Sequence, residues 1–218
     1  CKNNAEIYGY NYVGGICGKA SGANISNCVC LSSGNVNIAS WSSECNYHGG
    51  IVGYAEKSNI RNSRVESMVQ GTKYVGGVCG YFSGSNTRDA ASYKIENCTN
   101  GTSAIFVQGS GKSYGGGIVG CITDNAILNS CYPLGSVNSS GTELGGVAGY
   151  VGGNSLVRNC GRGKDGGQIN SSSYDTNLAT AGGVGSVVGT LEGSTIENCY
   201  NVAEVSGTQK VGGIVGHA

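Results

Sequence analysis

Apolar and glycine positions recur along the chain in a fixed order, and the residues between them are mostly small and polar. The block Gly-Gly-(Ile/Val)-x-Gly begins at Gly14, Gly49, Gly76, Gly116, Gly145 and Gly212, and a copy with Ser in its second position begins at Gly185. The first glycines are separated by 35, 27, 40, 29, 40 and 27 residues. Such self-similarity is typical of a repeat architecture, here with a minimal unit of 27 residues and insertions of variable length.

A second block follows the first and consists of an apolar residue, any residue, Asn, and then Cys or Ser. In four copies we place the apolar residue seven positions after the closing glycine, at Ile25, Ile60, Ile127 and Ile196. In two further copies, at Ile95 and Val157, insertions of eight and one residues delay it. Because Asn tolerates the left-handed backbone region, we expect a tight turn at each of these Asn residues.

The short apolar segments predict strands and not helices. Each glycine inside a helix costs about 1 kcal/mol relative to alanine, and no apolar stripe with a 3.6-residue period is present. One repeat is too small to close a core, but equivalent strands of successive repeats can pair about 4.8 Å apart. We therefore predict an all-β, right-handed parallel β-solenoid (β-helix) with about three short strands per coil and six to seven coils. It spans residues 1–218 as a single repeat domain, expected to be a fragment of a longer chain, with glycines at crowded corners.

The overall composition restricts the partners. The chain has 41 Gly and 1 Pro without Gly at every third position, which excludes a collagen triple helix. Thirteen basic and thirteen acidic residues cancel and no basic run is present, so we expect no nucleic-acid partner. No stretch reaches the roughly 18 apolar residues of a membrane helix, so we expect no membrane insertion within this segment.

The two blocks together resemble the GLUG repeat, whose core is Gly-Leu-hydrophobic-Gly; this chain has Ile or Val at the Leu position, as at Ile16 and Val78. GLUG repeats occur in bacterial surface adhesins and in the N-terminal region of the metallopeptidase type of immunoglobulin A1 protease. The resemblance covers nearly the whole chain and implies a structural or adhesive module of a secreted or cell-surface protein, with catalysis elsewhere. The partners expected on this basis are host or matrix glycans, surface proteins, or neighbouring repeats of the same assembly.

Few residues are suited to catalysis or metal binding. The two histidines, His48 and His217, cannot form a closely spaced zinc pair, and a serine or cysteine triad would need one of them as its base. The alternative function is a polysaccharide lyase or glycosidase, which needs paired carboxylates on one face of the solenoid. The candidate acids are scattered, at Glu56, Glu66, Asp89, Glu96, Asp165 and Asp175. We therefore expect no enzyme, no cofactor and no metal.

Tyrosines recur at two positions beside the glycine block. They stand two residues before it at Tyr12, Tyr47, Tyr74 and Tyr114, and directly after it at Tyr54, Tyr81 and Tyr150. In a solenoid these positions become columns, in which stacked rings stabilise neighbouring coils or offer a flat amphipathic surface to a ligand. We name these seven tyrosines, together with Trp41 in an insertion, as the candidate ligand-binding residues.

Eleven cysteines are present, and their repeat positions constrain their pairing. We expect one column to hold Cys1, Cys28, Cys98, Cys160 and Cys199, with Ser63 and Ser130 completing it, and most of it to remain reduced. Cys17 and Cys79 lie two coils apart in another column and should not bridge. Cys30 and Cys45, which flank an insertion, are the structural disulfide candidates.

Overall fold

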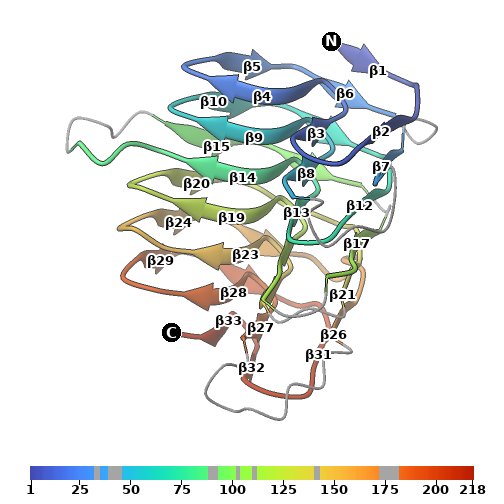
Figure 1. Ribbon diagram of the computed structural model, residues 1–218. Helices are drawn as coiled ribbons and strands as arrows, with labels where there is room; N and C mark the ends of the chain where they lie inside the picture. The colour runs from blue at the N-terminus through green and yellow to red at the C-terminus, as the bar shows by residue number, and fades with distance from the viewer. Residues whose placement is uncertain are drawn as a thin grey trace.

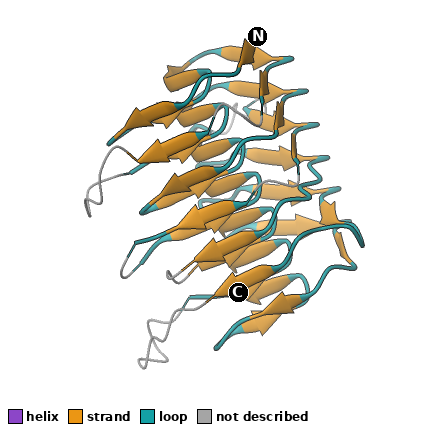
Figure 2. Cartoon of the chain, turned by 90° about the vertical axis from the view of Figure 1, so that its right-hand side faces the viewer, coloured by secondary structure: helices purple, strands orange, loops and turns teal. Residues whose placement is uncertain are grey.

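The computed structural model describes residues 1–31, 35–38, 46–87, 93–101, 104–109, 112–139, 143–171 and 182–218. These residues form 33 short strands and no helix. The chain passes through five sheets in turn and then returns to the first, and each return adds a parallel strand beside the previous one (Figures 1 and 2). This all-β stack of parallel strands is consistent with a β-solenoid.

We name each sheet after the strand that it receives from the first full turn of the chain. The β4 sheet contains β4 (Cys17–Ser21), β9 (Val52–Glu56), β14 (Cys79–Ser83), β19 (Val119–Thr123), β23 (Ala148–Val151), β28 (Val188–Leu191) and β33 (Val215–His217). The β5 sheet contains β5 (Asn24–Ser26), β10 (Asn59–Arg61), β15 (Lys94–Glu96), β20 (Ile127–Asn129), β24 (Leu156–Arg158) and β29 (Thr195–Glu197). In Figure 1 the strands of the β4 sheet descend from the N-terminus to the C-terminus of the stack.

Three further sheets complete the turns. The β6 sheet contains β1 (Lys2–Asn3), β6 (Val29–Cys30), β11 (Arg64–Val65) and β16 (Thr99–Asn100). The β7 sheet contains β2 (Ile7–Gly9), β7 (Val36–Ile38), β12 (Val69–Gly71), β17 (Ile105–Val107), β21 (Val137–Ser139), β26 (Ile169–Ser171) and β31 (Val205–Ser206). The β8 sheet contains β3 (Val13–Gly14), β8 (His48–Gly49), β13 (Tyr74–Gly76), β18 (Tyr114–Gly116), β22 (Glu143–Gly145), β27 (Val184–Gly185) and β32 (Val211–Gly212).

The β6 sheet does not continue beyond β16. After a gap of one turn, β25 (Gly161–Arg162) and β30 (Tyr200–Asn201) form a separate two-stranded sheet. The intervening turn carries Pro133, which has no backbone N–H to donate to a neighbouring strand. The chain nevertheless keeps its course, because the amide of Leu134 donates to the carbonyl of Asn100 at 2.8 Å.

A complete turn therefore contains five short strands, and the turn with Pro133 contains four, so the prediction of about three was wrong. The structure splits the predicted segments, because a glycine corner or a left-handed residue interrupts the pairing every few residues. The three sheets with seven strands match the seven glycine blocks.

The core lies between the sheets and is filled by one aliphatic or small side chain per column. Ile60, Ile95, Leu128 and Val157 form one fully buried column of the β5 sheet, and Val69, Ile105, Val137 and Ile169 form another in the β7 sheet. Their burial supplies the main driving force for stacking, because each fully buried aliphatic side chain contributes roughly 1.5–3 kcal/mol.

The glycine block forms the corner between the β8 and β4 sheets. A Cβ on Gly76 would overlap the carbonyl oxygen of Cys79, and a Cβ on Gly77 would overlap the carbonyl oxygen of Gly117 in the next turn. Gly77 also faces the side chain of Asn100 across the core. The prediction of crowded corners is confirmed, and the cause is close approach of backbone to backbone.

The Asn of the second block adopts the predicted left-handed conformation in five of the six copies, all but Asn129. Asn27, Asn62, Asn97, Asn159 and Asn198 all have φ between 49° and 54°. They turn the chain from the β5 sheet towards the next strand.

The register of the fourth full turn differs from the one predicted. Leu128, and not Ile127, pairs with Ile95 and Val157 in the buried column, while Ile127 pairs with Lys94. The residues directly after Leu128 are therefore shifted by one position relative to the predicted alignment, and Ser130 takes the left-handed position, with φ 52°. Cys131, and not Ser130, therefore stands in the cysteine column.

Candidate functional site

Tyr12, Tyr47, Tyr74 and Tyr114 form one continuous stack of rings, which we call the tyrosine ladder. Successive ring centroids are 5.0 Å apart, and the ring planes are within 5° of parallel. Tyr74 and Tyr114 begin β13 and β18, and the other two directly precede β3 and β8. The predicted column is thus confirmed by the geometry.

A second tyrosine column, Tyr54, Tyr81 and Tyr150, lies beside the ladder on the β4 sheet. Tyr54 and Tyr81 stack at 5.4 Å, and both meet ladder rings edge to face, as Tyr74 and Tyr81 do at 5.2 Å and 87°. Tyr150 meets Tyr114 in the same way at 5.6 Å and 74°. Edge-to-face contacts are the favoured geometry of aromatic pairs, so the two columns hold each other in place.

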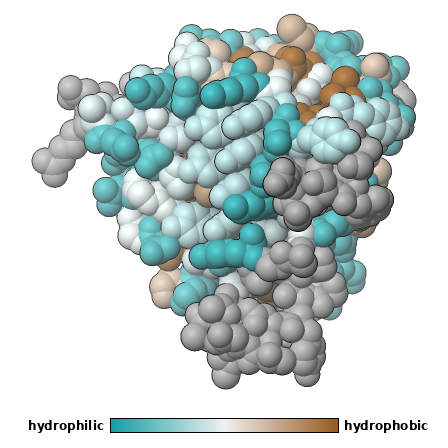
Figure 3. Space-filling view, viewed as in Figure 1, coloured by the Kyte–Doolittle hydropathy of each residue, from teal (hydrophilic) through white to brown (hydrophobic). Residues whose placement is uncertain are grey.

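The two columns together form the tyrosine face, a surface of flat rings that lies over the β4 and β8 sheets (Figure 3). From Gly53 to Glu56, buried and partly exposed residues of β9 alternate, which turns Tyr54 outward while Ala55 fills the core. Tyr12 and Tyr47 have φ of 56° and 66°, a conformation that is unfavourable for a bulky residue. The surrounding stack holds these two rings in the ladder despite that strain.

Both columns are shorter than the full stack. Cys121 stands between Tyr81 and Tyr150 in the second column, and Lys19 precedes Tyr54 there. In the ladder, Glu143 takes the position after Tyr114. We did not identify Glu143 from the sequence, although it also lies two residues before a glycine block, and this spacing could have revealed it.

Polar groups border the second column on its outer side. The hydroxyl of Tyr150 donates to Glu192 at 2.7 Å, and that of Tyr81 lies 3.1 Å from the hydroxyl of Thr123. Burial raises the pKa of Tyr54 to about 12, so its hydroxyl stays protonated at physiological pH. This edge therefore offers hydroxyl groups and carboxylates beside the rings, a combination that can hydrogen-bond a polar ligand lying on them.

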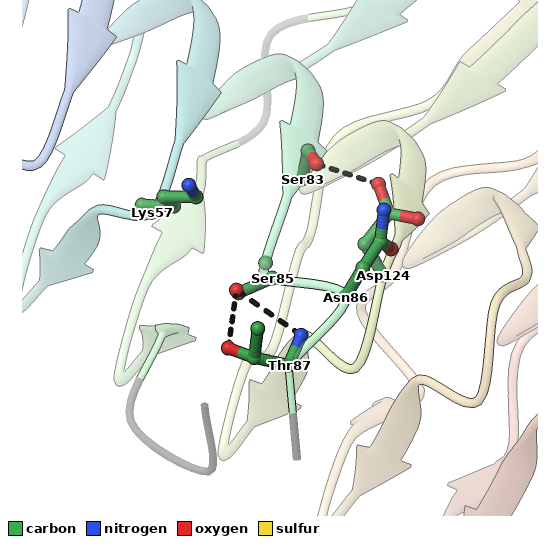
Figure 4. Close-up of a pocket in the computed structure, with 7 residues that line it drawn as sticks. Lys57, Ser83, Ser85, Asn86, Thr87 and Asp124 are labelled. Atoms are coloured by element: carbon green, nitrogen blue, oxygen red, sulfur yellow. Dashed lines mark hydrogen bonds between the residues drawn. The ribbon is translucent and has the colours of Figure 1, made fainter. Parts of the chain in front are cut away.

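A small pocket of about 180 Å³ continues this polar edge (Figure 4). Asp124 accepts hydrogen bonds from Ser83 at 2.6 Å and Thr123 at 2.9 Å. The hydroxyls of Ser85 and Thr87 lie 3.0 Å apart at the opposite side. The pocket is lined by Lys57, Ser83, Gly84, Ser85, Asn86, Thr87 and Asp124. All of its lining side chains are polar, and Asp124 connects it to the tyrosine face through Thr123, whose hydroxyl lies 3.1 Å from that of Tyr81.

Lysines lie over the rings of the ladder. The ammonium groups of Lys19, Lys73 and Lys112 are 5.7, 5.3 and 6.0 Å from the ring centroids of Tyr12, Tyr74 and Tyr114. These are cation–π distances, worth roughly 0.5–1 kcal/mol each at an exposed site. The tyrosine face thus has cationic groups over the ladder and an acidic edge at the second column.

Trp41 and Cys45 lie outside the described residues, as do Asp89 and Asp175. Cys30, the other disulfide candidate, is fully buried in β6, where its sulfur accepts a hydrogen bond from Ser67 at 3.2 Å. The Cys30–Cys45 bridge stays a prediction. Cys17 and Cys79 are free, and Val52 separates them in their column, as the predicted register requires.

The candidate acids that the structure describes are dispersed. Glu96 forms a salt bridge with Lys94 at 2.8 Å and accepts a hydrogen bond from Asn129 at 2.8 Å. Glu66 forms a salt bridge with Arg64 at 2.6 Å, and Asp165 is exposed. Glu56 accepts a hydrogen bond from Ser21 at 2.8 Å.

His48 is buried in the β8 sheet, where burial lowers its pKa to about 4.

Among the described residues, no three or more His, Cys, Asp and Glu side chains are arranged to share a metal ion. The same part of the chain contains no helix with the length and apolarity needed to cross a membrane. No family model, curated protein sequence or solved structure matches the chain.

Proposed function

We propose that the chain is a right-handed β-solenoid module of a secreted or cell-surface protein, and that its tyrosine face binds glycans. The stacked sheets support a rigid module, because strands in successive turns pair along the length of the stack. Right-handedness follows the general rule for parallel strands joined by crossovers in one sheet. The resemblance to GLUG repeats supports the surface location.

The observation that carries the proposal is the continuous row of partly exposed tyrosine rings. Sugars present flat apolar faces and a rim of hydroxyl groups, so they bind where aromatic rings lie beside hydrogen-bonding side chains. On this surface the rings of Tyr74 and Tyr81 supply the apolar contact, and Thr123 and Glu192 lie at its edge. We infer that this module binds its ligand without chemical change, because the described carboxylates are held in separate contacts.

A glycan array probed with the chain tests the proposal, followed by affinity measurements on the glycans that bind. Tyr74→Ala removes one of the two inner rings of the ladder and should weaken binding about tenfold, which corresponds to about 1.4 kcal/mol. Tyr8→Ala is the matched control, because Tyr8 is 61% exposed but lies on β2, outside the tyrosine face. We expect no change in that variant.

Failure of every glycan to bind, or an equal loss in the two variants, would contradict the proposed face. A reducing-sugar assay on each bound polysaccharide distinguishes binding from cleavage. We expect no new reducing ends, and their appearance would support the lyase or glycosidase alternative instead.

A further inference from the structure

Four cysteines stand in one column in four successive turns of the chain. Each lies two residues after the end of its β5-sheet strand, and the strand register places Cys98 beside Cys131, Cys131 beside Cys160, and Cys160 beside Cys199. We call Cys98, Cys131, Cys160 and Cys199 the cysteine row. The shifted register of the fourth full turn makes the row continuous, because it brings Cys131 into the position expected for Ser130.

The four sulfurs point in one direction. The thiols of Cys98 and Cys131 each donate to the carbonyl two residues earlier at 3.3 Å, and those of Cys160 and Cys199 do so at 3.1 and 3.3 Å. Each sulfur also lies 3.8–4.0 Å from a carbonyl oxygen of the preceding turn. The row is therefore an uninterrupted line of sulfur atoms.

The row lies in the core, beneath the corner formed by the left-handed residues. Cys98, Cys131 and Cys160 are fully buried, and Cys199 is partly exposed. Asn97, directly before Cys98, is exposed, so local opening of this corner gives a small ion access to the sulfurs.

A disulfide fits this arrangement poorly. In-register parallel neighbours keep both their Cα and their Cβ atoms about one strand spacing, roughly 4.8 Å, apart. A disulfide needs Cβ atoms about 3.5–4.5 Å apart, so two turns would have to approach each other. All four cysteines of the row are free. A tetrahedral zinc site is also not supported, because the row brings sulfurs together only in pairs.

We propose that the cysteine row binds soft monovalent metal ions, with Cu(I) as the representative, each held linearly between two sulfurs of adjacent turns. Two metal–thiolate bonds of about 2.3 Å span roughly 4.6 Å, close to the strand spacing of about 4.8 Å. Thiolates select Cu(I) among the ligand types found in proteins. The row offers three such positions, one between each successive pair.

Charge balance favours a monovalent ion in this buried site. Each Cu(I) that binds displaces one thiol proton and forms one copper–thiolate bond, and the neighbouring sulfur supplies the second bond. Neither copper nor sulfur changes oxidation state, and the row remains uncharged. Divalent ions at all three positions would need six protons to leave, and the row has only four thiols, so a net charge of +2 would remain buried.

The test is a titration of the reduced protein with Cu(I) under anaerobic conditions, against a competing Cu(I) chelator. Retained copper is counted by native mass spectrometry, and thiolate-to-copper absorption is followed in the ultraviolet. Cys131→Ser removes two of the three positions and should lose about two-thirds of the copper bound by the row. The fold should survive, because Ser63 occupies this column naturally. Cys160→Ser also removes two positions and gives a second, independent variant.

Cys79→Val is the matched control, because Val52 and Val119 flank Cys79 in its own column. It removes a buried thiol outside the row and should retain all the copper. Cys1 and Cys28 are also adjacent and are unchanged in every variant. Copper bound between them is therefore a constant amount that is subtracted from the copper counted in each protein. The proposal is overturned if the native chain retains no copper against the chelator, if the Ser variants retain as much as the native chain, or if peptide mapping finds Cys131 in a disulfide.

Discussion

A side chain at Gly77 has no room, because the position faces the carbonyl oxygen of Gly117 and the side chain of Asn100. Gly77→Val should lower the free energy of unfolding by about 1–3 kcal/mol, as measured by urea denaturation. Gly213→Val is the control, since Gly213 has the same position in the last glycine block and nothing lies within 4 Å of a Cβ there. We expect its effect to stay below about 0.5 kcal/mol. Equal effects in both variants would contradict the corner geometry.

His48 makes the stability of the fold depend on pH. It is fully buried, and neither ring nitrogen has a well-aligned partner in the described part of the chain, so burial lowers its pKa to about 4. The unfolded chain binds this proton at about pH 6.5. The contribution of neutral His48 is therefore complete above pH 6.5 and is lost as the pH falls towards 4, by up to about 3 kcal/mol.

His48→Val should remove this pH dependence, because Val13 and Val75 occupy the same column in the adjacent turns. Unfolding curves of the two proteins between pH 7 and 4 provide the measurement. The native chain should lose stability faster than the variant over this range. Parallel curves for the two proteins would show that His48 titrates normally in the folded state.

Among the elements, the strands of the second block depend on the left-handed residue that follows them. Asn97, with φ 53°, connects β15 to β16. Asn97→Ala should destabilise the fold by about 1 kcal/mol, because alanine has no side-chain group to support this conformation, whereas Asn97→Gly should be nearly neutral. Thermal unfolding of both variants checks this. An equal loss in the two variants would mean that the Asn97 side chain, which donates to Asn62 at 3.4 Å, matters more than its backbone conformation.

The sequence predicted where strands occur better than how they align. Glycine and Asn positions mark corners and turns, and apart from Asn129 these were located correctly because their backbone requirements are local. Ile127 and Leu128 are adjacent and both apolar, so the sequence offered no local reason to choose between them; packing decides, and Leu128 is the one fully buried. Arg162 was missed because its guanidinium lies inside the core, held by the carbonyl oxygens of Gly135 and Gly146 at 3.0 and 3.3 Å.

Over the whole molecule, the tyrosine face could be predicted because stacking converts a fixed spacing in the sequence into a column in space. The edge-to-face contact between the two columns could not be predicted, because it depends on how the β8 and β4 sheets meet at the glycine corner. The interruption by Cys121 follows from its strand pairing with Tyr81 and Tyr150. Similarly, the polar edge is assembled from side chains that are 42 residues apart, such as Tyr81 and Thr123.

The central claim is that successive rings of the ladder act as one ligand surface, and calorimetric titration with oligosaccharides of increasing length tests it most directly. The ligands are prepared from whichever polysaccharide binds the native chain. Affinity should rise with each added sugar until the ligand spans the ladder from Tyr12 to Tyr114, and Tyr74→Ala should remove most of the gain from the longer ligands. An affinity that does not depend on ligand length, or a length dependence that survives in Tyr74→Ala, would contradict a continuous binding surface.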